Sequence, residues 1–412
     1  MKPSLLSPAG NMEKMKAAIN FGADAVYLAG KAFGMRAAAG NFTREEMEEA
    51  VAYAHGRGVS VNVTVNVMPR GDEYGALAEY LSFLEGLKPD ALIVSDLGVI
   101  ELAKRKAPSL PLHLSTQASV VSAEAAKAYH ALGVKRIVLA RELSMEEVRA
   151  IRRDTPDSLE LETFIHGAMC VSYSGRCLLS NNLAARDGNR GQCAQPCRWE
   201  YRFAYIEEKM RQGQMIPVEE DAFGTYIMSS KDMCMIEHIP ELMESGIDCF
   251  KIEGRMKSVC YVSAVTNAYR MAMDAYRRQG SDYRFDPLWL RELESVSHRE
   301  YATGYYYGEP SENANLCSGL PLISETAYIA TALSDSDENG IALFEQKNKS
   351  FLGETLELLT PGQTGRAFAA ERMWDEEGNA IDSTPHPLMR YRMALPFAVK
   401  QGDIIRRAAA DA

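Results

Sequence analysis

The 412-residue sequence contains no long apolar run and no common nucleotide-binding or zinc-protease motif. No stretch approaches the roughly 18 apolar residues that a membrane-spanning helix needs. The first residues, MKPSLLSPAGNMEK, carry Pro, Gly and charges where a signal peptide needs an apolar stretch of about 7–15 residues. The absence of a P-loop, of G-x-G-x-x-G after a strand and of H-E-x-x-H argues against ATP, a Rossmann cofactor and zincin chemistry. We therefore expect a cytoplasmic protein with no membrane partner.

The composition is that of an ordinary folded protein, with 46% hydrophobic and 25% charged residues. The net charge of −11 argues against non-specific coating of nucleic acid by the whole surface, although it leaves room for a local basic groove. The length predicts two domains, one of them large.

Short apolar runs recur through the first 254 residues, with helix-like stretches between most of them. These runs are Ser4–Ser7, Ala25–Leu28, Val59–Val65, Ala91–Val94, Leu112–Ser115, Arg136–Ala140, Leu159–Ile165 and Cys249–Glu253. Buried parallel strands have this appearance. Eight strand–helix units over roughly 250–300 residues predict an α/β fold of the (β/α)8 TIM-like barrel type. An open doubly wound sheet is the alternative.

Polar residues follow five of the predicted strands, at their carboxyl ends. They are Ser95-Asp96, Thr116-Gln117, Arg141-Glu142, His166 and Glu253-Gly254-Arg255. Any one of them is also typical of an ordinary turn or helix cap. Because the carboxyl ends of barrel strands carry active sites, we expect these residues to converge on one cavity mouth.

The predicted barrel domain spans residues 1–285 and contains an insertion at about 168–247, before the eighth strand. This insertion holds all four clustered cysteines and should lie over the barrel mouth. A linker follows at 286–319, and residues 320–412 alternate in strand fashion between turn residues. We expect a small C-terminal all-β domain, a β-barrel or a sandwich.

The cysteines of the insertion are Cys170, Cys177, Cys193 and Cys197, with the spacing C-x6-C-x15-C-x3-C. Structural zinc usually uses C-x2-C pairs, which are missing here, so the looser spacing favours an iron–sulfur cluster. Zinc and unligated buried thiols stay open as alternatives. Cys234, on an apparent helix, is an alternative ligand.

The remaining cysteines, Cys249, Cys260 and Cys317, are more typical of buried thiols. A catalytic pair of Cys170 and His166 can also be drawn. A thiolate nucleophile needs a base that a third residue orients, and nothing in the sequence marks that third residue. A nucleophile would also leave three clustered cysteines unexplained.

Several longer segments resemble peptidase family U32, the collagenase-like group. They are LLSPAGNMEKMKAAINFGADAVYLAG, HLSTQAS, ETFIHGAMCVSYSGRCLLS, GNRGQCAQPCR, SSKDMCMIEHIPELMESGIDCFKIEGRMKS and SHREYATGYYYG. The resemblance covers nearly the whole chain and is closest to the branch that hydroxylates tRNA wobble uridine to 5-hydroxyuridine. It implies an oxygen-independent RNA hydroxylase. A peptidase is the alternative, and hydroxylation of rRNA cytidine or of a quinone precursor is a further one.

The resemblance also implies cofactors and partners. Cys170, Cys177, Cys193 and Cys197 match the family's cysteines and would hold a 4Fe-4S cluster, with Cys234 as the alternative fourth ligand. Prephenate would be the source of the hydroxyl group. The partners would be tRNA, an electron donor and a paralogous subunit of the same family.

A hypothesis for the site follows from residue chemistry. The expected catalytic residues are Glu162, His166, Lys251 and Glu253, which would orient a base or move protons. The expected substrate-binding residues are Arg36, Gln117, Arg141 and Arg255, whose cations would neutralise phosphate or carboxylate groups. A base that undergoes chemistry must be accessible, so the mouth would take a flipped-out or single-stranded anticodon base. Salt bridges within the barrel are the alternative for each charged residue.

Overall fold

The computed structural model describes residues 3–35, 40–170, 172–173, 175–199, 205–207, 215–217, 230–308 and 327–408. Arg36 and Cys317 lie outside these residues. The chain forms two compact units. The first contains the barrel strands and the helices between them from α2 to α8, and the second contains α1, α9, α10 and the C-terminal strands.

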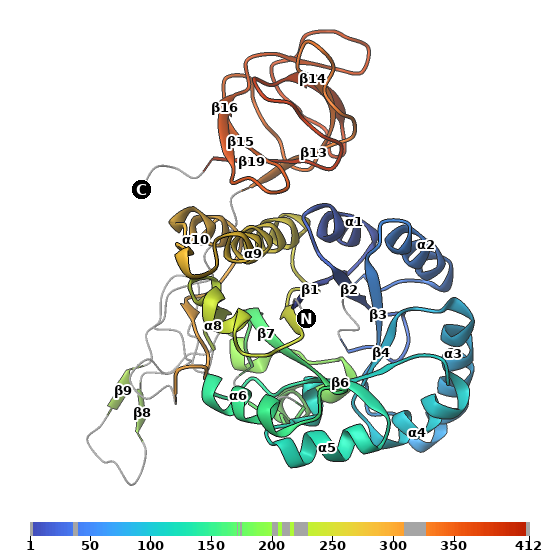
Figure 1. Cartoon of the computed structure of the whole chain (residues 1–412). Helices are drawn as coiled ribbons and strands as arrows, with labels where there is room; N and C mark the ends of the chain where they lie inside the picture. Colours follow the sequence, from blue (N-terminus) through green and yellow to red (C-terminus); the bar gives the residue numbers. More distant parts are fainter. Residues whose placement is uncertain are drawn as a thin grey trace. The chain divides into compact units, whose positions relative to one another are not determined.

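Eight parallel strands close into a barrel in the first unit (Figure 1). Strands β1 to β7 are neighbours in chain order, and β11 pairs with both β7 and β1. The strands are β1 (Ser4–Pro8), β2 (Ala25–Leu28), β3 (Ser60–Val65), β4 (Ala91–Val94), β5 (Leu112–Leu114), β6 (Val134–Val138), β7 (Glu160–Ala168) and β11 (Cys249–Ile252). The predicted TIM-like barrel is confirmed, and the open sheet is excluded because the strand order closes on itself.

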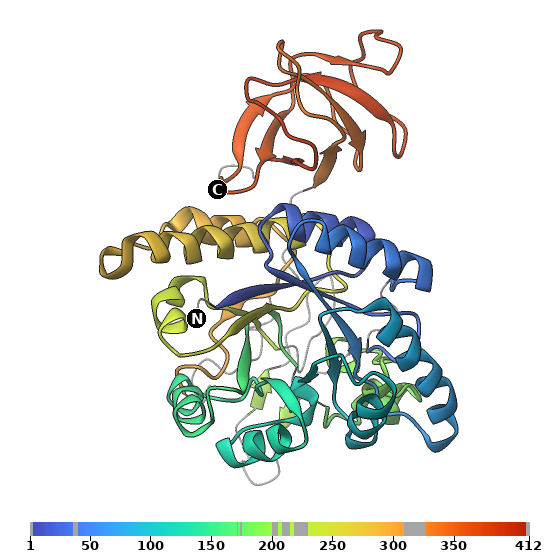
Figure 2. The same ribbon diagram turned by 45° about the vertical axis from the view of Figure 1, so that its right-hand side comes forward.

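Helices surround the barrel strands (Figure 2). In the first unit they are α2 (Arg44–His55), α3 (Tyr74–Leu87), α4 (Leu97–Lys106), α5 (Ala123–Ala131) and α6 (Met145–Asp154). Side chains cap several of their first turns. Thr43 forms a capping box with Glu46, and Asp96 accepts a hydrogen bond from the Val99 backbone N–H. Asp96 therefore caps helix α4. This is the ordinary helix-cap role that the sequence left open for it.

Two expectations about the insertion need correction. Strand β7 continues to Ala168, so His166 lies within the strand and not after it. Cys234 ends strand β10 (Asp232–Cys234), which pairs antiparallel with β7, and is not on a helix. The rest of this region contains α7 (Leu179–Ala184), the β8–β9 hairpin (Tyr205–Glu207 and Met215–Pro217) and α8 (Ile239–Met243). A later strand, β12 (Tyr301–Ala302), pairs with β10.

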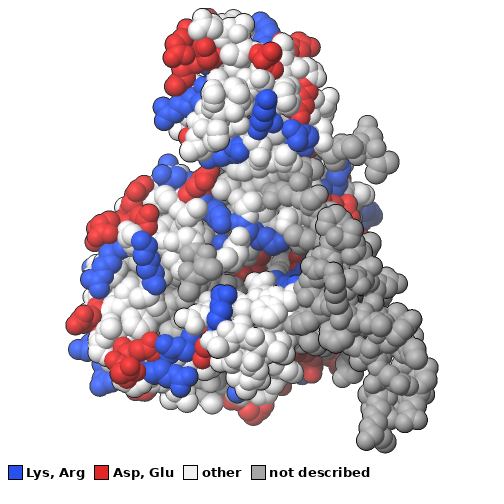
Figure 3. All heavy atoms as spheres, turned by 180° about the vertical axis from the view of Figure 1, so that it is seen from behind, with Lys and Arg blue, Asp and Glu red and all other residues white. Residues whose placement is uncertain are grey.

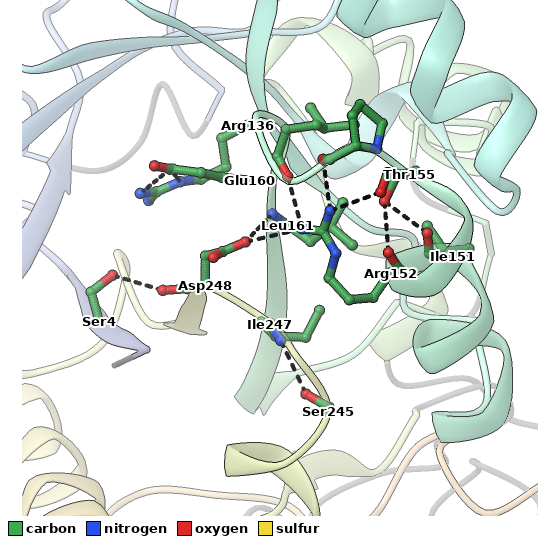
Figure 4. Close-up of polar contacts among 12 residues, drawn as sticks. Ser4, Arg136, Ile151, Arg152, Thr155, Glu160, Leu161, Ser245, Ile247 and Asp248 are labelled. Atoms are coloured by element: carbon green, nitrogen blue, oxygen red, sulfur yellow. Dashed lines mark hydrogen bonds and ion pairs between the residues drawn. The ribbon is translucent and has the colours of Figure 1, made fainter. Parts of the chain in front are cut away.

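A polar network ties the amino ends of the strands together (Figure 4). The Asp248 carboxylate accepts the Leu161 backbone N–H at 2.9 Å and lies 3.5 Å from Arg152 Nη1. Ser4 Oγ donates to the Asp248 carbonyl at 3.4 Å. The network joins β1, β7 and the residue before β11, where the barrel closes. Polar contacts at this end of a barrel serve stability, because the chemistry lies at the opposite end.

The second unit contains α1 (Met12–Asn20), α9 (Val259–Gln279), α10 (Pro287–Glu294) and a seven-stranded antiparallel sheet. The strands are β13 (Tyr328–Ala332), β14 (Ile341–Gln346), β15 (Thr355–Leu359), β16 (Arg366–Ala369), β17 (Met373–Trp374), β18 (Arg390–Ala394) and β19 (Ile404–Arg407). The C-terminal all-β region is thus confirmed. None of the described helices has the length and the apolar composition that a bilayer-spanning segment requires.

Candidate functional site

A pocket with a cavity volume of about 180 Å³ opens at the carboxyl ends of the barrel strands. Its lining comes from residues on or just after β2, β3, β4, β5, β6, β7 and β11, together with the cysteine-bearing segment. Seen from behind the view of Figure 1, the molecule is hollowed near its centre, with Lys and Arg side chains around the hollow (Figure 3). The convergence of strand ends on one mouth is therefore present in the structure.

The pocket brings together five of the eight expected catalytic and substrate-binding residues: Gln117, Arg141, Lys251, Glu253 and Arg255. Lys251 and Glu253 both face it, as their alternation along one strand predicts. Two other expected residues, Glu162 and His166, are buried in β7 and do not line it.

Glu162 acts on the pocket through Lys251. Its Oε1 accepts from Lys251 Nζ at 2.9 Å, and its Oε2 lies 3.3 Å from Arg136 Nη1. Burial alone would raise the pKa of Glu162, but the charges of Lys251 and Arg136 outweigh it and lower this pKa to about 2. The carboxylate therefore stays ionised and holds the Lys251 ammonium, which lies 4.6 Å from the centre of the Tyr27 ring.

His113 on β5 completes this interior group. Burial lowers its pKa to about 3, and the positive charge of Arg136 adds to the effect while Glu162 opposes it. The ring is thus neutral at physiological pH. This buried group consequently comprises one carboxylate, two cations and a neutral imidazole.

The two pocket arginines are held by neighbouring oxygen atoms. Arg141 Nη1 donates to the Ala168 carbonyl at 2.7 Å, and its guanidinium lies 4.1 Å from the centre of the Phe164 ring. Arg255 Nη1 donates to Thr64 Oγ1 at 3.2 Å. Both cations are therefore oriented before any ligand binds, which lowers the entropy cost of binding an anion.

Cys170, Cys177, Cys193 and Cys197 all line this pocket, and Cys234 does not. Burial raises the pKa of the Cys197 thiol, the positive charge of Arg198 opposes this, and the other three cysteines add to it. Backbone N–H groups reach two of the sulfurs: Leu179 N–H donates to Cys177 Sγ and Gln195 N–H to Cys193 Sγ, each at 3.4 Å.

The arrangement of these sulfurs bears on which metal group they could hold. Within the described ranges, no group of three or more His, Cys, Asp or Glu side chains is arranged to hold one metal ion. A cluster contains several irons and can accept ligands that lie farther apart than those of one zinc. N–H donors to sulfur are also among the contacts that tune such clusters. The four cysteines are thus compatible with a cluster.

The cysteine-bearing segment is fastened to the barrel on one side by charge. Arg190 donates to both Glu73 carboxylate oxygens, at 2.6 and 2.7 Å, and to the Met68 carbonyl at 3.2 Å. The Arg190 hydrogen bond lowers the pKa of Glu73 to about 2. Bidentate pairing of this kind fixes direction as well as distance.

Four further pocket residues, Tyr27, Thr64, Asn66 and Ser115, were not singled out from the sequence. Asn66 directly follows the predicted strand Val59–Val65, so the rule that selected Gln117 applies to it equally. Tyr27 and Thr64 lie inside strands, where the side chains that face the pocket alternate with those that do not. No turn signal marks them.

The fold and site define a TIM-like barrel protein with cysteines and cationic side chains at its mouth. The model of peptidase family U32 matches residues 10–316, and the model of the peptidase family U32 C-terminal domain matches residues 324–406. The chain belongs to peptidase family U32.

Relatives that are similar to this chain in sequence carry different names. The tRNA hydroxylation protein P1 of Bacillus subtilis is 37% identical over 406 residues, covering 98% of this chain and 95% of the relative. The 23S rRNA 5-hydroxycytidine C2501 synthase of Escherichia coli is 36% identical over 73% of this chain and 45% of its own length. A collagenase of Porphyromonas gingivalis is 31% identical over 87% of this chain and 86% of the relative.

Proposed function

We propose that this protein hydroxylates wobble uridine of tRNA to 5-hydroxyuridine without using oxygen. The observation that carries the proposal is that four cysteines share one pocket with oriented cations at the mouth of the barrel. The similarity to the tRNA hydroxylation protein P1 extends over nearly the whole of both chains, which supports tRNA over the other RNA substrate. The match to the rRNA synthase covers less than half of that protein.

Cys170, Cys177, Cys193 and Cys197 would hold a 4Fe-4S cluster, and Cys234 is less suited because it does not line the pocket. When bound, such a cluster supplies electron transfer or activates an oxygen-bearing ligand. Arg141, Arg255 and Lys251 bind anions, either RNA phosphate or the carboxylates of a hydroxyl donor such as prephenate. Glu162 holds Lys251 in place by a hydrogen bond.

Glu253 is a carboxylate of the pocket lining that lies within hydrogen-bond distance of Tyr27. Tyr27 Oη lies 3.2 Å from Glu253 Oε2 and 3.0 Å from the Ile252 carbonyl, and either oxygen can accept its one proton. A carboxylate in this position can accept a proton from a bound base. An electron donor and a paralogous family subunit remain proposed partners.

The peptidase alternative rests on the collagenase relative and needs a nucleophile beside a base. Cys170 lines the pocket, whereas His166 is buried in β7 outside its lining. A nucleophile and its base must lie within hydrogen-bond reach of each other, and the pocket lining contains only one member of this pair.

Nucleoside mass spectrometry of tRNA tests the proposal. A deletion strain that lacks redundant hydroxylation routes should lose 5-hydroxyuridine and its derivatives, and the wild-type gene should restore them. Cys177→Ala should not restore them, whereas Cys234→Ala should. Unchanged nucleosides in the deletion strain would contradict the proposal, and casein or collagen turnover lost only in Cys170→Ala would favour the peptidase.

A further inference from the structure

The side-chain amide of Gln117 is held in one orientation at the pocket wall. Gln117 follows β5, lines the pocket and is only 7% exposed. Its Oε1 accepts from Asn66 Nδ2 at 2.7 Å and from Ser115 Oγ at 3.1 Å. Its Nε2 is buried and has no hydrogen-bond partner among the residues that the structure describes.

The orientation follows from a backbone group that can only donate. The Met35 backbone N–H donates to Asn66 at 3.1 Å, so the Asn66 atom that receives it must be the oxygen Oδ1. The other end of the Asn66 amide is then an NH2 group, and its partner on Gln117 must be the oxygen. Turning the Gln117 amide over would set two NH2 groups against each other. Gln117 therefore offers a ligand a donor and no acceptor.

This donor lies beside the cysteine wall. Gly175, between Cys170 and Cys177, has φ +75°, and a Cβ atom there would lie 2.8 Å from the backbone oxygen of Gln117. Only glycine permits this approach. A ligand atom bound to Gln117 Nε2 is consequently held in the same pocket that the cysteines line.

From this geometry we infer that Gln117 is a specificity-determining residue that selects uracil over cytosine. Uracil carries the acceptor O4 where cytosine carries the donor N4–H2. A hydrogen bond from Nε2 to O4 holds the base at C4. This carbon is bonded to C5, which is the atom to be hydroxylated. Cytosine would leave two donors facing each other in a buried site, which disfavours it by about tenfold to hundredfold. The inference rests on the proposed function and adds to it a preference for uracil over cytosine.

The test compares a tRNA with its wobble uridine and the same tRNA with wobble cytidine, both expressed in the deletion strain. Wild-type protein should hydroxylate the uridine and leave the cytidine. Gln117→Glu replaces the donor by an acceptor that can bind N4–H2, so the ratio of hydroxylated uridine to hydroxylated cytidine should fall at least about tenfold. Gln401→Glu is the control. Gln401 is exposed and lies between β18 and β19, so its substitution should leave this ratio unchanged.

A second variant tests the orientation without touching Gln117. Asn66→Leu removes the group that fixes the amide, which can then turn over and present its oxygen. Purified Asn66→Leu should bind anticodon stem-loops with wobble uridine and wobble cytidine about equally in fluorescence anisotropy, while wild-type protein prefers uridine. Melting temperatures identify variants that fail to fold.

The outcomes separate the two proposals. If wild-type protein hydroxylates uridine but the ratio is unchanged in Gln117→Glu and the binding preference is unchanged in Asn66→Leu, the assignment of Gln117 is wrong and the proposed function stands. If wild-type protein hydroxylates neither base, the proposed function fails, and the selectivity falls with it.

Discussion

Lys251 and Glu162 show how a buried carboxylate in the barrel interior positions a pocket residue. Both side chains are almost fully buried, and Arg136 adds a second cation to the same carboxylate. Glu162→Gln would leave the buried Lys251 without its carboxylate, while Arg136 would keep Glu160 at 2.6 Å. The free energy of unfolding should therefore fall by about 3–5 kcal/mol in urea titrations. Glu101→Gln, which breaks the exposed pair with Lys104, serves as control and should change little. A loss no larger than in the control would contradict this account.

His113 makes a prediction about pH. Its pKa in the folded protein is about 3, below the usual value near 6.5 in an unfolded chain. The unfolded chain therefore binds the extra proton between these values, and stability is lost as pH falls below about 6.5. His113→Asn should reduce the slope of unfolding free energy against pH by about 1.4 kcal/mol per pH unit in this window. Equal slopes in both proteins would show that His113 is not protected from protonation.

The cysteine-bearing segment is an element whose position depends on a close backbone approach. Gly175→Ala should push it off Gln117, because the added Cβ meets the Gln117 backbone oxygen and φ is positive. We expect a loss of bound iron and of hydroxylation, with little change in melting temperature, since this segment packs at the barrel rim. Gly188→Ala is the matched control, because its Cβ would make only ordinary contacts with Cys193 at 3.6 Å. Equal iron content in both variants would contradict the prediction.

The bidentate pair of Arg190 and Glu73 fastens the same segment on another side. Glu73→Gln should raise hydrogen exchange of the backbone around residues 188–198 while exchange in the barrel strands stays unchanged. The charge-exchanged double variant Glu73→Arg with Arg190→Glu should restore protection in part. Protection that does not respond to either change would mean that other contacts hold the segment.

The sequence predicts the elements that depend on local pattern and misses those that depend on distant partners. Ala25–Leu28 and Ala91–Val94 form β2 and β4 with the predicted bounds, because each is a short apolar run between turn residues. Strand β10 was missed, since Asp232–Cys234 is a strand through its pairing with β7 on one side and β12 on the other, both distant in the sequence. Likewise, Glu162 and Lys251 are 89 residues apart, and only barrel closure shows that they pair.

At the scale of the whole molecule, a second buried charge cluster holds the C-terminal strands to α10 within their own unit. Arg406 on β19 contacts Glu292 at 2.9 Å and Glu357 at 2.7 Å, and all three side chains are buried. Arg406→Met would leave the buried Glu292 without a cation, while Glu357 would keep Arg291 at 3.0 Å. Calorimetry should therefore show this unit unfolding earlier, with a loss of about 3–5 kcal/mol. Arg407→Met, beside the more exposed Glu354, is the control. Identical traces for the two variants would contradict this role.

The central claim is that the cysteines at the barrel mouth hold an iron–sulfur cluster that serves the chemistry of the pocket. Iron analysis and visible spectra of anaerobically purified protein test it most directly. We predict a brown protein with about four irons per chain, as a 4Fe-4S cluster requires, lost in Cys197→Ala and kept in Cys234→Ala. A colourless protein that contains zinc and no iron would contradict the claim, and iron lost only in Cys234→Ala would overturn the ligand set.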